Sequence, residues 1–425
     1  MNILIRDILA VLPDGVKICS VSIENGVITS IGGEPGGFKA DKTISGGGKM
    51  LIPGLVNAHT HAYMTVFRNC ADDLTFNDWL FGRIMPLEDK LTAEDCYWGT
   101  LLGFMEMLST GTTSFNDMYI RADASARAVT EAGIRGVLSR GLSGGADDAA
   151  GGERRLKEAV EEIEKWKSAE NIIFMLGPHA PYTCDSGYQK EVAGEARRLG
   201  VGLHTHVSES AAEMASIKER YGCTPPELFD RTGLLTGRTV AAHGVYLTDS
   251  DIELMAARGA SLATNPVSNL KLANGVAPVP KLLKAGVNVA LGTDSAGSNN
   301  ALNMFRELGL VTILHKGMSG NPQAVTAREG FDMATKNGAK ALGLNKVGEI
   351  KTGYKADLVI LSLDRPNIQP LNDPVAALAY SFNGAEVETV MVGGRLLMEN
   401  REFLTIDRDK VIYEVNKICE RIGTR

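Results

Sequence analysis

The segment Pro53–His61, which reads Pro-Gly-Leu-Val-Asn-Ala-His-Thr-His, is an apolar run that ends in two histidines separated by one residue. Side chains at positions i and i+2 of a β-strand point to the same face, so His59 and His61 leave the same side of the strand's end. Two imidazoles placed in this way can bind one metal ion. The same spacing also arises by accident on a surface or in a pair of core histidines, so the positions of the other histidines decide between these interpretations.

The composition is that of an ordinary globular protein with a large core. The chain has 425 residues, of which 44% are hydrophobic, 22% charged and 6% aromatic, and this length suggests one large domain with an appendage. The net charge is −7, and no run of lysines or arginines is present that could neutralise a phosphate backbone. These features argue against a nucleic-acid partner.

Nothing in the sequence predicts export or insertion into a membrane. The first twelve residues are apolar but include Arg6 and Asp7, lack a small-residue cleavage site, and fall short of the roughly 20 residues that span a bilayer. The six cysteines are scattered without Cys-x-x-Cys spacing, as expected of reduced thiols rather than a disulfide framework. We expect a cytoplasmic enzyme.

From residue 51 to about residue 340, short β-rich runs alternate with helical patterns, which predicts repeated βα units and a parallel sheet. Helices are expected over Thr92–Leu108, Glu153–Trp166 and Ala324–Leu342, and the first has Asp95 three residues after Thr92, close to a capping box. Eight strands are predicted: Leu51–His61, Thr112–Met118, Arg135–Gly141, Ile172–His179, Gly202–Glu209, Thr239–Tyr246, Ser261–Asn269 and Val287–Asp294. The expected fold is therefore α/β, a TIM-like (β/α)8 barrel over residues 56–344, with its functional groups at the carboxyl ends of the strands.

The two ends of the chain have a different pattern. Val16–Ile28 alternates apolar and polar residues and contains an Asn-Gly turn, and Ala356–Leu361 and Val387–Arg395 supply similar strands near the other end. Neither flank could bury a sheet face by itself. We expect residues 1–55 and 345–425 to form one composite β-sandwich domain, with a closing helix over residues 407–422.

Five of the seven histidines fall at the ends of predicted barrel strands, which core histidines placed at random would not do: His59, His61, His179, His206 and His243. His315 lies inside a predicted helix and is expected to be structural. His204 shares a strand face with His206, so the spacing allows either one to be a ligand.

Two acidic residues accompany these histidines. Glu209 follows His206 by three residues and could shuttle protons at the same site, although a glutamate near a helix N-terminus is also common. Asp294, in Gly-Thr-Asp-Ser, follows the apolar strand 287–291, where a buried aspartate needs a cation or several donors, although a capping aspartate is the alternative. Three imidazoles and one carboxylate suit zinc or ferrous iron with a position open for water, whose pKa such a cation lowers to about 7. The site is suited to hydrolysis.

These residues resemble the motifs of the amidohydrolase superfamily. The resemblance covers nearly the whole chain and rests on Pro-Gly-Leu-Val-Asn-Ala-His-Thr-His, His-Thr-His-Val-Ser-Glu, Ala-Ala-His-Gly and Gly-Thr-Asp-Ser. Within that superfamily the chain is most similar to the 5-methylthioadenosine/S-adenosylhomocysteine deaminases, through Pro-Leu-Glu, Gly-Pro-His and the Asn-Pro-x-Ser-Asn run at residues 265–269. Triazine hydrolases and other aminohydrolases share much of the same core.

The resemblance implies a set of roles at the metal site. It makes four residues the metal ligands: His59, His61, His206 and Asp294. Glu209 would protonate a ring nitrogen of the substrate, while His243 and Asp294 would orient the reacting water. Members with two metals have a bridging lysine on the fourth strand, and Ile172–His179 contains none. One divalent metal ion is therefore expected, zinc in the first place, with iron as the alternative.

The resemblance also implies substrate contacts, in which Glu209 and Asp294 take part. Glu88 would accept hydrogen bonds from the ribose hydroxyls and His179 would hydrogen-bond the nucleoside. Arg140 and Arg154 stand where the family has arginines that can meet the amino-acid carboxylate of S-adenosylhomocysteine. The residues alone allow simpler interpretations: Glu88 as a solvated loop acid, and Arg154 as a helix-surface charge.

The expected activity is hydrolysis of a C–N bond in a cyclic amidine. The substrates would be adenosines modified at the 5′ position, namely 5-methylthioadenosine and S-adenosylhomocysteine, with adenosine and 5′-deoxyadenosine as further candidates, and the products the inosine analogue and ammonia. One alternative is an aminohydrolase or chlorohydrolase of a triazine, guanine or cytosine ring. Another is an inactive barrel scaffold, which should have lost ligands that this chain retains. The expected partner is a small nucleoside, and the sequence leaves open whether the protein forms a homo-oligomer.

Overall fold

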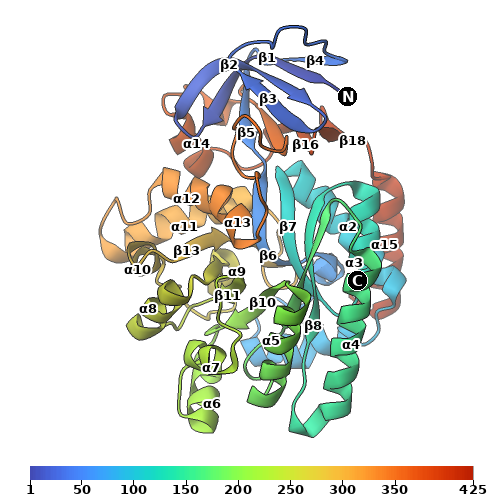
Figure 1. The fold of residues 1–425 in the computed structure, drawn as a ribbon, viewed down its shortest axis with the longest axis vertical. Coiled ribbons are helices and arrows are strands. Elements are labelled where there is room, and N and C mark those ends of the chain that lie inside the picture. Colours follow the sequence, from blue (N-terminus) through green and yellow to red (C-terminus); the bar gives the residue numbers. More distant parts are fainter. Residues whose placement is uncertain (425) are drawn as a thin grey trace.

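The computed structural model describes residues 1–424, and two nine-stranded sheets organise them. Figure 1 shows a sheet built from the two ends of the chain at the top and a larger body of parallel strands and helices below it. The upper sheet is mostly antiparallel, with parallel pairs of β1 with β4 and with β5. No helix of the described residues is long and apolar enough to cross a membrane.

Strands from both ends of the chain share the upper sheet. Its order is β18-β17-β16-β15-β5-β1-β2-β3, with β4 paired to β1, and the junction between the two ends is the antiparallel pair of β5 and β15. The strands are β1 (Ile3–Leu12), β2 (Gly15–Glu24), β3 (Val27–Ile31), β4 (Lys42–Ser45), β5 (Lys49–Pro53), β15 (Leu358–Ser362), β16 (Val387–Val392), β17 (Arg395–Glu399) and β18 (Glu402–Phe403). The expected turn between β2 and β3 is present, since Asn25 and Gly26 have φ values of 51° and 76°, as a type I′ hairpin turn requires.

The lower sheet is curled and its strand pairs are all parallel. Its order is β13-β12-β11-β10-β9-β8-β7-β6-β14, and its strands are nearly all buried, as expected when helices cover a parallel sheet. The strands are β6 (Leu55–His61), β7 (Thr112–Tyr119), β8 (Arg135–Leu142), β9 (Ile172–Pro178), β10 (Gly202–Val207), β11 (Thr239–His243), β12 (Ser261–Thr264), β13 (Asn288–Leu291) and β14 (Asp294–Ser295). β6 begins beside the upper sheet and runs away from it, so the carboxyl ends of the parallel strands lie at the far end of the body (Figure 1).

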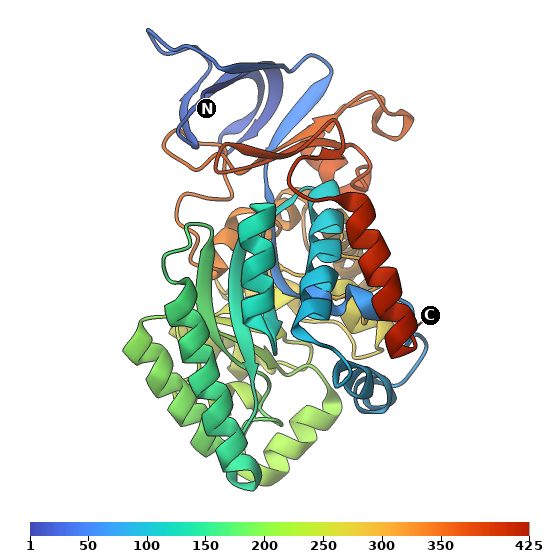
Figure 2. The same ribbon diagram turned by 90° about the vertical axis from the view of Figure 1, so that its right-hand side faces the viewer.

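Helices surround the curled sheet, and Figure 2 shows α15 lying beside α2 on the outside. The predicted cap of α2 is a complete capping box between Thr92 and Asp95. The helices of this body are α2 (Ala93–Ser109), α3 (Ala122–Ala132), α4 (Ala149–Trp166), α5 (Ser186–Leu199), α6 (Ala211–Tyr221), α7 (Pro225–Thr232), α8 (Asp249–Arg258), α9 (Pro266–Lys271), α10 (Val279–Lys284), α11 (Met304–Ser319), α12 (Ala327–Met333), α13 (Lys336–Ala341) and α15 (Arg408–Ile422). Shorter segments are η1 (Ala62–Phe67), the π-helix η2 (Asp78–Ile84), α1 (Met85–Glu88), η3 (Ala146–Asp148), η4 (Pro366–Ile368) and α14 (Pro374–Tyr380).

The expected strand Val287–Asp294 is two strands, β13 and β14, separated by Gly292 and Thr293. Three further predicted elements differ from the structure. The expected strand Leu51–His61 is two strands in different sheets, because the chain crosses between the sheets at Gly54, where an added Cβ would lie 2.0 Å from the hydroxyl of Thr113. The expected strand Ser261–Asn269 ends at Thr264, since Pro266 removes a backbone donor and begins α9 instead.

The third difference is the helix expected over Ala324–Leu342. It is two helices, α12 and α13, separated by Thr335, whose φ of −131° and ψ of −97° are not helical. The turn allows α13 to lie against β6 and β13.

Candidate metal centre and active site

Four side chains meet at the carboxyl end of the parallel sheet. The Nε2 atoms of His59 and His61, both on β6, lie 3.5 and 3.3 Å from Oδ1 of Asp294 on β14. The Nε2 atom of His206, on β10, lies 3.4 Å from that of His61. Ligand atoms around a tetrahedral ion with bonds of about 2.0–2.1 Å are about 3.3 Å apart, so these separations fit a transition-metal ion. Nε2 of His59 is fully buried without a hydrogen-bond partner, which also indicates that an ion belongs here.

Hydrogen bonds behind these side chains orient them. Nδ1 of His61 donates to the carbonyl of Met118 and Nδ1 of His206 to that of His179, each at 2.7 Å. A carbonyl oxygen can only accept, so in both rings the proton is on Nδ1 and the lone pair of Nε2 faces the site. Such contacts behind the ligands are the usual support of a metal site.

The carboxylate of Asp294 is held in the same manner. Its Oδ2 accepts hydrogen bonds from the hydroxyls of Ser268 and Ser298, at 2.6 and 2.7 Å, which leaves Oδ1 for the site. Asp294 has a φ of 57°, a left-handed conformation that is uncommon for a residue other than glycine. The backbone is therefore strained at the residue that carries this carboxylate, as is common at functional sites.

His204 lies behind His59 rather than in the ligand group. Its Nε2 is 2.7 Å from Nδ1 of His59, and its Nδ1 is 3.1 Å from the hydroxyl of Ser139, which donates to the carbonyl of Asp117. That carbonyl can only accept, so the hydroxyl of Ser139 uses its proton there and must itself accept from Nδ1 of His204. Nε2 of His204 then carries no proton and accepts a hydrogen bond from Nδ1 of His59. Burial and the neighbouring imidazoles lower the pKa of His204 well below its usual value, consistent with a neutral ring. The structure thus answers the question that the spacing left open, since His206 points to the site and His204 supports His59.

Glu209 and His243 lie next to the ligand group. Oε1 of Glu209 is 3.9 Å from Nε2 of His243, and it accepts a hydrogen bond from the amide of Asn274 at 3.3 Å. Burial raises the pKa of Glu209, which favours a carboxyl that can carry a proton. Nδ1 of His243 is 2.8 Å from the side-chain oxygen of Asn269 and 3.3 Å from the side-chain nitrogen of Asn265.

Several supporting residues had not been identified from the sequence. They are Ser139, Ser268, Ser298, Asn269 and Glu213. The carboxylate of Glu213 accepts from the backbone N–H groups of Ser208 and Glu209, at 2.7 and 2.9 Å, and so holds the turn that carries the acid. Two signals were available: the Ser-x-x-Glu spacing of Ser210 and Glu213, typical of a helix start, and the Asn-Pro-x-Ser-Asn run, which contains Ser268 and Asn269.

A cavity of about 230 Å³ opens beside the metal-facing atoms. Its lining includes three of the four predicted ligands, His61, His206 and Asp294, together with Glu209 and His243. The segment around η2 and α1 contributes six apolar side chains to the lining: Phe76, Trp79, Leu80, Phe81, Ile84 and Met85. A cavity of this character suits a small molecule with a flat apolar part and a few polar groups.

Glu88 and His179 both line this cavity, so Glu88 is not a solvated loop acid. The hydroxyls of Tyr63 and Tyr119 donate to its Oε1 at 2.8 and 2.7 Å. Burial raises the pKa of Glu88 to about 7. Nδ1 of His179 lies 3.0 Å from the hydroxyl of Thr183.

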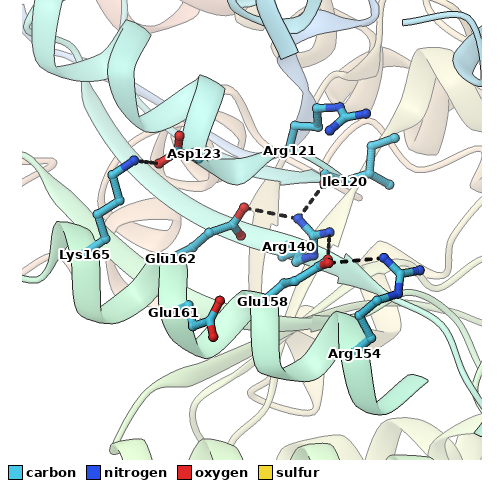
Figure 3. A pocket seen from close by; sticks show the side chains of 9 residues that line it. All are labelled: Ile120, Arg121, Asp123, Arg140, Arg154, Glu158, Glu161, Glu162 and Lys165. Carbon is cyan, nitrogen blue, oxygen red and sulfur yellow. Dashed lines mark hydrogen bonds and ion pairs between the residues drawn. The ribbon is translucent and has the colours of Figure 1, made fainter. Parts of the chain in front are cut away.

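The two predicted substrate arginines lie elsewhere. Arg140 and Arg154 line a second, neighbouring cavity and are absent from the lining of the first. Figure 3 shows them joined to the glutamates of α4: Arg140 to Glu158 and Glu162, and Arg154 to Glu158. Their contact with a substrate stays a prediction.

A model of the amidohydrolase family matches residues 50–397 of this chain. Among curated proteins, the 5-methylthioadenosine/S-adenosylhomocysteine deaminase of Dictyoglomus thermophilum is 46% identical over 420 residues, which cover 98% of each chain. The deaminase of the same name from Caldanaerobacter subterraneus subsp. tengcongensis is 44% identical over 428 residues, 99% of each chain.

Solved structures with the same fold are also found. An adenosine deaminase from Xanthomonas campestris, crystallised with bound zinc, is 34% identical and superposes with a TM-score of 0.95 over 100% of this chain and 99% of its own. The atrazine chlorohydrolase of Arthrobacter aurescens TC1, complexed with zinc, is 24% identical with a TM-score of 0.92 over 98% of this chain and 100% of its own. At that identity the second likeness concerns the fold alone.

Proposed function

This chain belongs to the amidohydrolase family, and from that membership we propose that it catalyses the metal-dependent hydrolytic deamination of adenosines modified at the 5′ position. The products are ammonia and the corresponding inosine analogue. The observation that carries the proposal is that one cavity is lined by three of the four metal-facing side chains, by a carboxyl able to carry a proton and by Glu88. The names of the relatives, which are similar over almost their whole length, support the choice of substrate.

We also propose the fold in finer terms. Residues 56–344 form a (β/α)8 barrel, and residues 1–55 and 345–425, of which residue 425 lies outside the described residues, form a composite β-sandwich domain with a C-terminal helix. The barrel is supported by β13 and β14, which are separated by Gly292 and Thr293 and pair with β12 and β6 at opposite ends of the sheet path. The composite domain is supported by the pairing of β5 with β15.

One divalent metal ion, zinc with iron as the alternative, would be held by His59, His61, His206 and Asp294. Bound there, such an ion supplies a water-derived nucleophile at neutral pH and polarises the reacting centre. The donor set of imidazoles and one carboxylate suits either metal. Zinc is favoured by the zinc-bound structure of the adenosine deaminase, which is 34% identical to this chain.

The protein's own groups divide the remaining work. Glu209 carries a proton to N1 of the purine, a role that its burial beside the metal-facing atoms supports. His243 and Asp294 orient the attacking water. His243 has the left-handed φ of 74°, a strained conformation of the kind that functional sites retain.

Glu88 and His179 position the nucleoside. Oε1 of Glu88 is occupied by two tyrosine hydroxyls, so Oε2 is the oxygen that accepts from the ribose. His179, which lines the same cavity, hydrogen-bonds the nucleoside. The partner is a small nucleoside. We place this activity in the cytoplasm, and the six free cysteines support that compartment.

The test is an ammonia-release screen in which kcat/KM is compared over 5-methylthioadenosine, S-adenosylhomocysteine, 5′-deoxyadenosine, adenosine, guanine, cytosine and a chlorotriazine. The 5′-modified adenosines should rank first, and Glu88→Ala should reduce their turnover while leaving any residual turnover of free bases unchanged. A free base or triazine in first place would contradict the proposal. So would a purified protein that contains no transition metal and takes none up.

A further inference from the structure

A second cavity adjoins the active-site cavity, and Ile120 lines both. Its other lining side chains are four basic and four acidic ones: Arg121, Arg140, Arg154, Lys165, Asp123, Glu158, Glu161 and Glu162. The basic charge is thus matched by acidic charge within the cavity itself. Such a surface has no excess positive potential to attract a free carboxylate.

Glu158 lies between the two arginines that the family resemblance assigns to substrate. Its Oε1 accepts from Nη1 of Arg154 at 3.1 Å, while its Oε2 accepts from Nη2 of Arg140. One carboxylate therefore bridges both guanidinium groups (Figure 3). A substrate carboxylate would form its strongest hydrogen bonds in this same position, between the two guanidinium groups.

Three of the five N–H donors of the Arg140 guanidinium are bonded to acceptors within the protein. Its Nη1 donates to the carbonyl of Ile120 at 2.7 Å and to Glu162 at 3.1 Å, and its Nη2 to Glu158. Its Nε is fully buried without a partner. The Arg140 side chain is only 15% exposed, so these contacts are held in a partly desolvated place where ion pairs are screened less than at the surface.

We propose that Glu158 acts as a built-in carboxylate that occupies the site between Arg140 and Arg154 and so selects for substrates with an uncharged 5′ substituent. The inference rests on the proposed deaminase function and concerns its specificity. A substrate that ends in an amino-acid carboxylate must displace Glu158 or approach it with like charge. A thioether or alkyl group instead contacts the partly exposed apolar side chains of Phe81, Met85 and Ile120, which line the active-site cavity.

The proposal is tested with the ratio of kcat/KM for 5-methylthioadenosine to that for S-adenosylhomocysteine in the metal-loaded enzyme. The wild-type ratio should be above 1. Glu158→Gln keeps the length of the side chain and removes its charge, and should raise kcat/KM for S-adenosylhomocysteine about tenfold relative to 5-methylthioadenosine. Glu161→Gln is the matched control, since Glu161 lies on the same helix in the same cavity but pairs only with Lys157, at 3.9 Å. It should leave the ratio unchanged.

A double variant tests whether the gain comes from the freed arginine or only from the change in net charge. Adding Arg154→Ala to Glu158→Gln should abolish the gain, because the vacated guanidinium is what binds the new carboxylate. A wild-type preference for S-adenosylhomocysteine, an unchanged ratio in Glu158→Gln, or a gain that persists without Arg154 would overturn the inference. A fall in S-adenosylhomocysteine turnover in Glu158→Gln would also overturn it, since Glu158 would then hold the substrate's ammonium group. Absence of ammonia release from every adenosine would instead overturn the proposed function.

Discussion

His204 and His206 show how two residues of the same type and strand face take different roles. Both are buried on β10, yet only His206 has its Nε2 beside that of His61, at 3.4 Å. His204 accepts a hydrogen bond from Nδ1 of His59 at its Nε2 and donates one from its Nδ1 to the hydroxyl of Ser139. The lone pair of His59 that faces the metal site therefore depends on a hydroxyl two hydrogen bonds away.

Ser139→Ala should lower the affinity for zinc about 10- to 100-fold, the usual effect of removing an outer partner of a ligand. Without the hydroxyl, Nδ1 of His204 loses its acceptor and the tautomer of the His204–His59 pair is no longer defined. The affinity is measured by competition with a chromogenic chelator. Ser114→Ala is the control, because that serine is buried on the neighbouring strand β7 and its hydroxyl has no partner. Equal zinc affinities in the two variants would contradict the assigned proton positions.

Glu209→Gln should lower kcat for the best adenosine substrate by about 10²- to 10⁴-fold, the range of general acid–base catalysis. The amide retains the size of the side chain and its acceptor toward Asn274, so metal content and the unfolding temperature should remain near those of the wild type. Steady-state kinetics and metal analysis are performed on the same preparation. A near wild-type rate would exclude Glu209 as the proton carrier.

At the scale of elements, local signals predicted which segments form but not always where they end. The Asn25-Gly26 turn and the Thr92 capping box are local, and both occur as expected. The boundaries at Gly54 and Thr335 depend instead on distant residues. Gly54 lies against Thr113 in a neighbouring strand, and the turn at Thr335 lets α13 reach β6. Such contacts between distant residues have no counterpart in the local pattern.

Glu307 on α11 joins two elements near the site and should make stability depend on pH. Its carboxyl accepts from the N–H of Val267 in α9 and from the amide of Asn299, and burial raises its pKa to about 8 from an ordinary value of 4.5. Between these two pH values the folded protein binds more protons than the unfolded chain, so stability is greatest below about 4.5 and declines as pH rises through 8.

Glu307→Gln should remove this contribution, so its free energy of unfolding should decline less steeply than that of the wild type between pH 5 and 8. The difference in slope amounts to a few kcal/mol, up to about 4 over the window. Urea unfolding at a series of pH values measures it. Glu253→Gln, on the exposed side of α8, is the control and should parallel the wild type. Parallel profiles for Glu307→Gln as well would show that Glu307 does not titrate in this range.

At the scale of the whole molecule, a buried ion pair connects the two sheets. Nε and Nη2 of Arg135, at the start of β8, donate to the two carboxylate oxygens of Asp357 at 2.7 and 3.0 Å, and Asp357 also accepts from the N–H of Gly393 at 2.7 Å. The side chains are 7% and 1% exposed. Asp357 immediately precedes β15 of the upper sheet, so this pair links that sheet to the parallel one.

Asp357→Asn should lower the free energy of unfolding by about 3–5 kcal/mol, because it leaves the guanidinium buried without a counter-charge. Urea denaturation at neutral pH checks this. Asp249→Asn removes one partner of an exposed pair with Lys281 and should change stability by less than about 1 kcal/mol. A similarly small loss in Asp357→Asn would mean that the junction tolerates an unpaired Arg135.

The sequence by itself determined the family, the parallel sheet and the set of residues at its carboxyl end. Membership of the amidohydrolase superfamily, predicted from the His-x-His pair and three further motifs, is confirmed, and the deaminase activity agrees with the names of the relatives. This was possible because strand periodicity and ligand spacing are local properties of the chain. The predicted roles of the individual site residues stay predictions.

Only the tertiary structure decided which neighbour each of those residues has. His204 turns to His59, Glu88 is held by Tyr63 and Tyr119, and Arg140 pairs with glutamates of α4 instead of lining the active-site cavity. Each of these contacts joins residues on different elements, between 18 and 145 positions apart in the chain. The physical reason is that hydrogen bonds and ion pairs depend on distances of about 3 Å, which the packing of whole elements establishes.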